Sequence, residues 1–542
     1  MCPVDFYESS TRARATGTSI PTECEVLVVG GGPAGSYTAS VLAREGIDTV
    51  LLEADSFPRY HIGESLLPSM KYFLEFIDLY EKFDAYGFVH KNGSTFKFNS
   101  KKPGFTDFLA AGGAGNHSWN VVRSEADHLI FKHARECGAK VFDKTKVNEI
   151  EFERSETVTN GNSNGIKKDT PATSLGKPVA ANWSQKESGR SGTIRFKYLV
   201  DASGRNGIVS QKYMKNRRYN QGLKSIAIWG YFKNAEHHGP GVGDPFFEAL
   251  SDGSGWAWLI PLHNGTVSVG LAIKQHLVAP KKKALGGLGT KDFYLHVLKN
   301  ETPVIAGHLE KAELVSDELR TASDWSYSAS EYASQNIRIA GDAGCFIDPL
   351  YSSGVHLAVN SGLSAAVTIC AAMRGQCTEE EAMLWHTHKV AEGYTRFLLV
   401  VTGSLDQIYG REEHILSPME DPGFDDAFEH FKPVIQGIIE AGGNLTRQEI
   451  SKSVNFCTSV ISKVDGGCLS DLDVDKEGQR GAAVTVHGKG NGKAADDRVD
   501  ATIMKIVRIH RVQNLDLFAQ DVINGMAPNM ERGKLGLKLV SS

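Results

Sequence analysis

The chain has 542 residues, of which 41% are hydrophobic and 23% charged, and its formal net charge is −5. This length suggests two to four domain-sized units with ample core, and the composition excludes wholesale disorder. The slightly acidic balance gives no reason to expect a nucleic-acid partner.

The N-terminal segment MCPVDFYESSTRARATG lacks the apolar stretch of a secretory signal. No run approaches the roughly 18 apolar residues of a membrane span. The eight cysteines are scattered and form no C-x-x-C pair. This pattern fits free thiols in a reducing compartment better than a disulfide frame or a zinc site. We therefore expect a cytoplasmic protein with no membrane span and no metal centre.

The first strong signal is a predicted dinucleotide-binding βαβ unit. An apolar strand at 26–29 runs into the pattern G-x-G-x-x-G, a helix follows to about residue 45, and a second strand ends in an acid. The glycines permit a tight turn and close approach of a pyrophosphate, and the helix N-terminus favours negative phosphates. The acid can accept hydrogen bonds from the adenosine ribose. These cofactor-binding candidates are Gly30, Gly31, Gly32, Ala34, Gly35 and Glu53.

Later segments favour FAD over NAD. Arg123 opens a predicted helix in WNVVRSEADHLIF, with Asp127 one turn later, and YLVDASGRNG around Asp201 reads as a strand that ends in a turn. The segment IRIAGDAGCFIDP places Asp342 just after a strand, which suits an acid that bonds a ribityl hydroxyl of a flavin. Each segment alone also fits an ordinary turn or a surface arginine. No second fingerprint for NAD(P)H is present.

The segment GWAWLIP, residues 255–261, sets two tryptophans on one face of a predicted strand, because side chains alternate along a strand. Trp256 and Trp258 therefore share a face, while Ala257 and Leu259 point the other way. Two indoles on one face either fill a core or form the wall of a closed site.

In this order and spacing the segments resemble the FAD-dependent aromatic hydroxylase superfamily, over roughly residues 22 to 375. That superfamily contains monooxygenases and halogenases. Three features resemble the flavin-dependent halogenases: the W-x-W-x-I-P pattern that ends at Pro261, the loop FIDPLYSSGVH at 346–356, and PRYHIGESLLPS at 58–69 followed by a lysine in GFVHKNG. The third feature is similar to halogenases that act on phenolic polyketides in fungi.

The resemblance implies a reaction and a set of roles. FAD enters as FADH2 from a separate NAD(P)H-dependent flavin reductase and, with O2 and chloride or bromide, yields hypohalous acid. The paired tryptophans form a structural wall that keeps the substrate from the flavin. The remaining implied positions are Glu64, Arg123, Asp342 and Val355 for the flavin, Ser353 and Gly354 for the halide, and Lys91 as the catalytic lysine, with Lys97 as the alternative.

One departure from the family pattern bears on the substrate. Tryptophan halogenases carry a glutamate just before the Ser/Thr-Gly pair of the halide loop, whereas this chain has Tyr351 and then Ser352. An indole needs help to stabilise the cationic intermediate of aromatic substitution, but a phenol stabilises its own. The loss of the acid points to a small phenolic substrate and leaves the general base unidentified.

The expected fold class is α/β: a discontinuous, Rossmann-like FAD domain of the aromatic hydroxylase type with a β-sheet substrate domain and a C-terminal helical region. We expect a flexible N-terminus at 1–21 and an FAD domain at 22–215, in which 81–102 belongs to the substrate region and 155–192 is a flexible insertion. The substrate sheet spans 216–330, the FAD domain returns at 331–375, and residues 376–542 form helices that cap the substrate, including a final helix over 502–528.

Two rival functions share this fold. An aromatic FAD monooxygenase would take electrons from NAD(P)H within the same chain, and the tryptophan pattern would be coincidence. A flavoprotein similar to geranylgeranyl reductases would reduce an isoprenoid double bond. Exchange of hydrogen for halogen on an electron-rich phenol distinguishes the halogenase from both.

Overall fold

The computed structural model describes residues 19–98, 103–153, 175–236, 241, 243–409 and 518–540. Its first sheet runs in the order β18-β19-β11-β1-β2-β7. All neighbours are parallel except β18, which is antiparallel to β19. Strands with runs as apolar as VLVV and TVLL are typical of a parallel sheet covered on both faces. The bounds are β1 (Val26–Val29), β2 (Thr49–Leu52), β7 (Lys140–Phe142), β11 (Tyr198–Asp201), β18 (Ala333–Ser334) and β19 (Ile337–Ile339).

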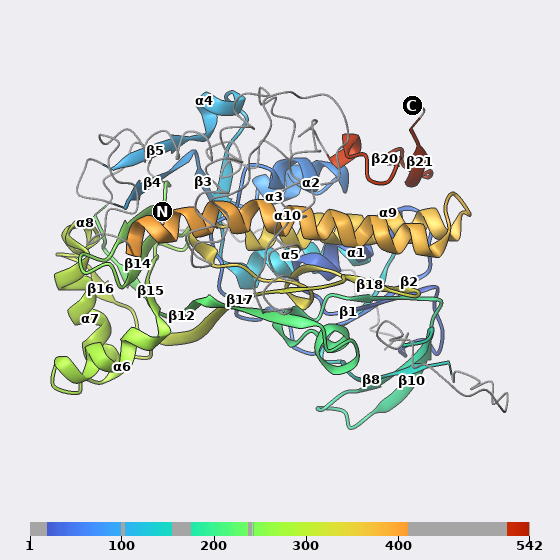
Figure 1. Cartoon of the computed structure of the whole chain (residues 1–542), viewed down its shortest axis with the longest axis horizontal. Coiled ribbons are helices and arrows are strands. Elements are labelled where there is room, and N and C mark those ends of the chain that lie inside the picture. The colour runs from blue at the N-terminus through green and yellow to red at the C-terminus, as the bar shows by residue number, and fades with distance from the viewer. Residues whose placement is uncertain are drawn as a thin grey trace, which may run out of the picture.

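Four long helices build the core around this sheet. Helix α1 packs against both α5 and α9, and α10 runs alongside α9 across the centre of the molecule (Figure 1). Helix α9 is long and apolar enough to cross a membrane, but 89% of its most apolar stretch is buried inside the protein, as in a core helix. The bounds are α1 (Pro33–Arg44), α5 (Arg123–Glu136), α9 (Gly354–Met373) and α10 (Glu379–Tyr409).

The second large sheet runs in the order β16-β12-β15-β14-β13-β4-β5, and β17 also pairs with β12. One face packs on α7 through Phe293 and Val297, while the other packs on α10 through Tyr394 and Phe397. The bounds are β4 (Gly93–Lys97), β5 (Gly104–Asp107), β12 (Arg217–Lys233), β13 (Phe246–Ala249), β14 (Gly255–Pro261), β15 (Val267–Lys274), β16 (Glu313–Leu314), β17 (Arg320–Ala329), α6 (Gln275–Ala284), α7 (Thr290–Glu301) and α8 (Pro303–His308).

Smaller elements complete the described fold. Strands β3 and β6 form a two-stranded ribbon, β8, β9 and β10 form an antiparallel sheet, and β20 pairs with β21. The bounds are β3 (Val89–Lys91), β6 (Ser118–Asn120), β8 (Lys146–Phe152), β9 (Pro178–Ser184), β10 (Ser191–Arg195), β20 (Met526–Asn529), β21 (Gly536–Leu539), α2 (Met70–Phe76), α3 (Tyr80–Asp84), α4 (Phe108–Gly112), and the short turns of helix η1 (Gly204–Asn206), η2 (Ile208–Tyr213), η3 (Gly341–Ala343), η4 (Pro349–Tyr351) and η5 (Phe518–Gln520).

Two expectations differ from this structure. The expected flexible insertion at 155–192 contains β9 and the start of β10, whose Ala181 and Ile194 are fully buried against β8. The expected final helix over 502–528 is wrong at its end, because 526–529 forms β20 and Gly525 takes a left-handed φ of 76° just before it. Most of the expected flexible N-terminus, residues 1–18, lies outside the described residues. So do residues 154–174 of the expected insertion and residues 410–517 of the expected C-terminal region.

Candidate functional site

A cavity of about 560 Å³ lies between the two large sheets. Its walls come from the βαβ unit, from the segment 59–65, from β12, β13 and β14, and from the N-terminus of α9. Most predicted cofactor and wall residues therefore meet in one place. Those that line it are Gly30, Gly32, Ala34, Glu53, Glu64, Arg123, Trp256, Trp258, Asp342, Gly354 and Val355, whereas Gly31, Gly35, Lys91, Pro261 and Ser353 lie behind its lining.

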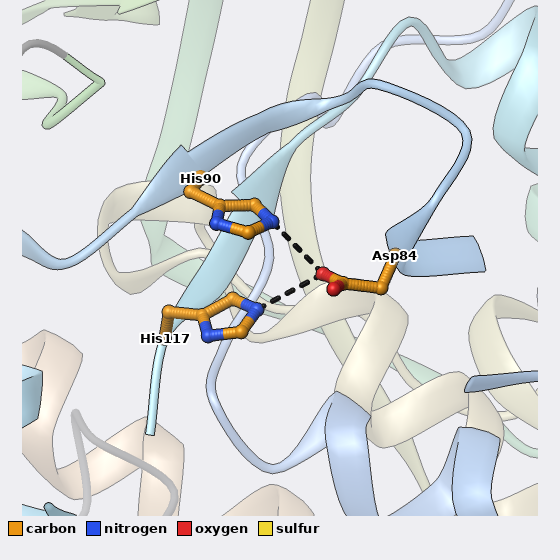
Figure 2. Close-up of side chains that lie close together, drawn as sticks. All are labelled: Asp84, His90 and His117. Carbon is orange, nitrogen blue, oxygen red and sulfur yellow. Dashed lines mark hydrogen bonds and ion pairs between the residues drawn. The ribbon is translucent and has the colours of Figure 1, made fainter. Parts of the chain in front are cut away.

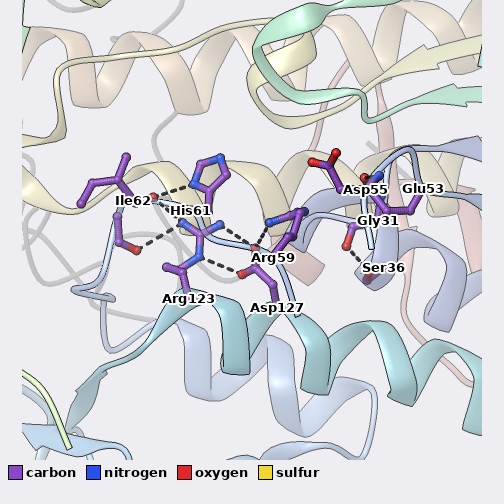
Figure 3. A network of polar contacts seen from close by, with 10 residues as sticks. Gly31, Ser36, Glu53, Asp55, Arg59, His61, Ile62, Arg123 and Asp127 are labelled. Atoms are coloured by element: carbon purple, nitrogen blue, oxygen red, sulfur yellow. Dashed lines mark hydrogen bonds and ion pairs between the residues drawn. The ribbon is translucent and has the colours of Figure 1, made fainter. Parts of the chain in front are cut away.

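The glycine loop is held open for a ligand by backbone packing. Gly30 takes a left-handed φ of 103°, and a Cβ there would lie 2.2 Å from the carbonyl oxygen of Ala202. A Cβ on Gly35 would lie 1.9 Å from the carbonyl oxygen of Gly30, so helix and strand also approach too closely for a side chain. The N–H of Gly31 donates to Oε2 of Glu53 at 2.5 Å (Figure 3). The loop thus forms a cradle that a dinucleotide phosphate fits.

Arg123 organises the loop that follows this cradle. Its guanidinium donates to both carboxylate oxygens of Asp127, at 2.8 and 3.0 Å, and to the carbonyl oxygen of Ile62 at 2.9 Å (Figure 3). Arg59 donates to the same carboxylate at 3.0 Å. Burial opposes the charge of Asp127, but the two arginines outweigh it and its pKa stays below the usual value. Arg123 therefore places a fixed positive charge on the cavity wall.

Asp342 and the start of α9 form the opposite wall. Burial raises the pKa of Asp342 to about 6, against the lowering effect of Arg205, Arg123 and Arg217. Gly354 has open space where a Cβ would lie, so the first turn of α9 is accessible from the cavity. The Oγ of Ser353 is buried without a hydrogen-bond partner among the described residues. A free hydroxyl beside free N–H groups at a helix N-terminus suits a small anion.

The tryptophans answer the question raised by GWAWLIP. Trp256 and Trp258 share a face of β14, with ring centroids 5.6 Å apart, and both line the cavity. Trp229 from β12 extends the row, 6.4 Å from Trp258. Ala257 and Leu259 face the other side of the sheet and belong to the core that packs against α7. The indoles therefore fill a core and wall a cavity at once.

Lys91 is buried at the end of β3, and only 1% of it is exposed. Its Nζ donates to Oγ of Ser65 at 2.9 Å and to the carbonyl oxygen of Leu66 at 3.0 Å, and lies 5.1 Å from the ring centroid of Phe108. Burial lowers the pKa of Lys91 from 10.5 to about 7, and Asp244 limits that shift. Because Ser65 lines the cavity, Lys91 reaches its wall through one hydroxyl.

Lys97 has a different environment. Its Nζ pairs with the buried carboxylate of Glu248 at 3.2 Å, an ordinary ion pair within the large sheet. Lys91 and Lys97 do not share a strand, because β3 ends before Asn92 and β4 begins after it, and the two strands belong to different sheets.

Sequence reasoning missed the partners of Glu64. Tyr231 donates to Oε1 of this buried carboxyl at 2.7 Å, and the hydroxyls of Tyr60 and Tyr231 lie 2.8 Å apart. Burial raises the pKa of Glu64, while Ser268 and Tyr231 counteract part of the rise. Ser65, the partner of Lys91, stands next to Glu64 in the motif and could have been found there. Tyr231 carries no local signal beyond strand alternation.

Comparison with known proteins places these features in a family. Residues 23–388 match the family model described as an FAD binding domain. The chain is 50% identical to the flavin-dependent halogenase ascD of Acremonium egyptiacum, over 96% of this chain and 93% of that protein. It is also 50% identical to the sulochrin halogenase gedL of Aspergillus terreus, over 96% and 94% of the two chains.

Solved structures agree with this relationship. The flavin-dependent halogenase CmlS is 27% identical, with a TM-score of 0.62 over 82% of this chain and 77% of that one. The myxobacterial chondrochloren halogenase CndH is 25% identical, also with a TM-score of 0.62, over 81% and 98% of the two chains. The cradle, the charged wall and the tryptophan row all fit FAD, and the chain belongs to the flavin-dependent halogenases.

Proposed function

We propose that this halogenase chlorinates or brominates a small electron-rich phenol, and that Lys91 carries the halogen to the ring. The observation that carries the proposal is the environment of Lys91. A buried lysine that has a pKa of about 7 and no acidic hydrogen-bond partner among the described residues has few structural uses. Groups perturbed in this way cluster at catalytic sites.

FAD would be held by the glycine loop, with Glu53 at the ribose and Asp342 near the ribityl chain. Reduced FAD supplies, together with O2, the two-electron oxidation of chloride or bromide to hypohalous acid. Ser353 and Gly354 offer the halide a hydroxyl and the N–H groups of the first turn of α9. Trp256 and Trp258 would exclude the organic substrate from the flavin, because their indoles close the side of the cavity that β14 forms.

Lys91 would receive the electrophilic halogen at the part of the cavity wall that Ser65 forms. With a pKa of about 7, about half of the amine is neutral at neutral pH. The neutral amine can bond the halogen covalently, and the ammonium can donate a hydrogen bond to hypohalous acid. The phenol carbon then gains the halogen and releases its proton.

The halide loop supports a phenol as the acceptor. Tyr351 occupies the position before the serine pair, and its hydroxyl lies 2.5 Å from Oγ of Ser404 on α10. Burial raises the pKa of Tyr351. The loop therefore presents a neutral, buried side chain at this position, and the substrate must stabilise its own cationic intermediate through a hydroxyl.

The electrons would come from a separate NAD(P)H-dependent flavin reductase, since the sequence carries one dinucleotide fingerprint. Delivery of FADH2 by diffusion places the enzyme in the reductase's compartment, and we propose the cytoplasm.

The experiment incubates the chain with FAD, a flavin reductase, NADH and an electron-rich phenol, with and without chloride or bromide. We expect product with the isotope pattern of the added halogen. Lys91→Ala should still oxidise FADH2 but give no halogenated phenol, whereas the control Lys97→Ala should keep halogenation. Hydroxylated phenol with NADH alone would refute the proposal and favour a monooxygenase, and full activity of Lys91→Ala would refute the role of the lysine.

A further inference from the structure

A cluster of metal-ligating side chains lies outside the flavin cavity. Asp84 ends α3, His90 lies on β3, and His117 immediately precedes β6. Nε2 of His90 lies 2.8 Å, and Nε2 of His117 3.1 Å, from Oδ1 of Asp84. Figure 2 shows both imidazoles directed at the carboxylate from the same side. We propose that these three residues bind a divalent transition-metal ion, and that Zn²⁺, which their ligand chemistry suits, is the ion they take.

The ribbon of β3 and β6 (the β3–β6 ribbon) explains why the two histidines meet. His90 lies directly opposite Trp119, and His117 lies two residues before Trp119 in the same segment of the chain. Diagonal positions of an antiparallel pair share a face, so both imidazoles project from one side. Their rings stack with centroids 4.1 Å apart.

The distances suit a tetrahedral ion. All three ligand atoms lie within 4.8 Å of one another. Zinc bonds of about 2.0–2.1 Å to nitrogen and oxygen separate neighbouring ligands by about 3.3 Å, so each imidazole nitrogen would move away from Oδ1 of Asp84 by about half an ångström or less. His90 is about half exposed, which leaves a solvent position for water as the fourth ligand.

The nitrogen and oxygen donors favour a transition-metal ion such as Zn²⁺ over Mg²⁺ or Ca²⁺. Two imidazoles and one carboxylate suit Zn²⁺, whereas Mg²⁺ and Ca²⁺ prefer oxygen ligands alone. The buried Trp119 supports the carboxylate, because its Nε1–H donates to Oδ1 at 2.9 Å. Such a partner orients a ligating carboxylate. His90, His117 and Trp119 all contact Oδ1 of Asp84 rather than Oδ2.

A hydrogen-bonded cluster without metal is the alternative. It requires both histidines to carry a proton on Nε2 and to share one oxygen with Trp119. The sequence predicted no metal centre because the cysteines showed no ligand spacing, and residues 84, 90 and 117 form no compact motif.

The site would fasten the outer face of the ribbon whose inner face holds Lys91. Consecutive residues of β3 point to opposite faces, so His90 and Lys91 lie on opposite sides. A bound ion would join α3, β3 and the start of β6, and β3 is the strand that carries Lys91. We expect it to stabilise this region of the fold, as a ligand that binds only the folded state does.

The test uses the full FAD-loaded chain, stripped with a chelator and dialysed against Zn²⁺. We expect one zinc per chain by mass spectrometry and a higher melting temperature with zinc than without. His90→Ala should reduce zinc affinity about 100-fold or more, and should remove the zinc-dependent rise in melting temperature. His90 is the exposed ligand, so its variant should fold. The matched control is His276→Ala, an exposed histidine of α6, which should bind zinc like the wild type.

Cobalt identifies the ligands independently. Co²⁺ at this site should show the visible bands of a tetrahedral ion without the charge-transfer band of a thiolate. The proposal is overturned if the wild type binds no zinc, if His90→Ala binds as much as His276→Ala, or if a thiolate band appears and binding survives in His90→Ala. None of these measurements depends on halogenation, so they stand apart from the proposed function.

Discussion

Replacement of Lys91 by methionine should separate the cost of the buried amine from its use. A pKa lowered from 10.5 to about 7 means that the folded protein binds the proton less tightly than the unfolded chain. Below about pH 7 both states are protonated, and the folded state bears the full penalty, about 5 kcal/mol. Stability then rises with pH up to about 10.5, because only the unfolded chain still holds the proton. Methionine has no such penalty.

The variant also loses two hydrogen bonds, to Ser65 and Leu66, which offsets the gain by about 1–3 kcal/mol. We therefore expect Lys91→Met to be more stable than the wild type by about 2 kcal/mol at about pH 6, and less stable by about 1 kcal/mol at about pH 9.5. The assay is urea unfolding of both proteins at the two pH values, since the difference between them isolates Lys91. A difference that does not change with pH would refute the buried, mostly neutral amine.

Three further predictions concern the cavity. Gly30→Ala should abolish FAD binding and lower stability, because its Cβ would meet the backbone of Ala202, as fluorescence titration and thermal melting would show. Glu53→Gln should weaken FAD binding about 10–100-fold through loss of a charge-assisted acceptor; unchanged affinity in the same titration would contradict its place at the ribose. The double change of Trp256 and Trp258 to phenylalanine should reduce stability and leave chlorination as the route to product, and hydroxylated phenol by mass spectrometry would show that the wall alone sets the reaction.

The local patterns of the sequence predicted the parts of the site that lie close together along the chain. The strand, the glycine turn and the helix from 26 to 44 are contiguous, so their geometry follows from backbone sterics and periodicity. The common face of Trp256 and Trp258 follows from strand alternation in the same way. The paired strands at 178–195 were missed because small residues such as Ala181 fill their buried face, and polar composition dominated the interpretation.

Contacts between distant segments were beyond these patterns. Nothing near Lys91 in the chain indicates that its amine meets Ser65 and Leu66, because that contact depends on how three backbone segments align. The same holds for His117, whose distance from Asp84 in sequence is too great for any spacing rule. Burial, and with it the shifted pKa, becomes visible only when these segments are placed together.

The alignment around Lys91 is itself set by backbone hydrogen bonds. Leu66 donates its N–H to the carbonyl of Trp119, and Val121 donates to the carbonyl of Glu64, so the segment 64–66 lies along β6 through an antiparallel bridge. Strand β6 in turn pairs with β3, which places Lys91 opposite Ser118 and within reach of Ser65. Because these contacts use main-chain atoms, the amine is held at the cavity wall by the ribbon rather than by a charged partner. Asp244 raises the pKa of Lys91 but burial outweighs it, so the amine keeps a pKa of about 7, whereas Lys97 forms an ion pair with Glu248.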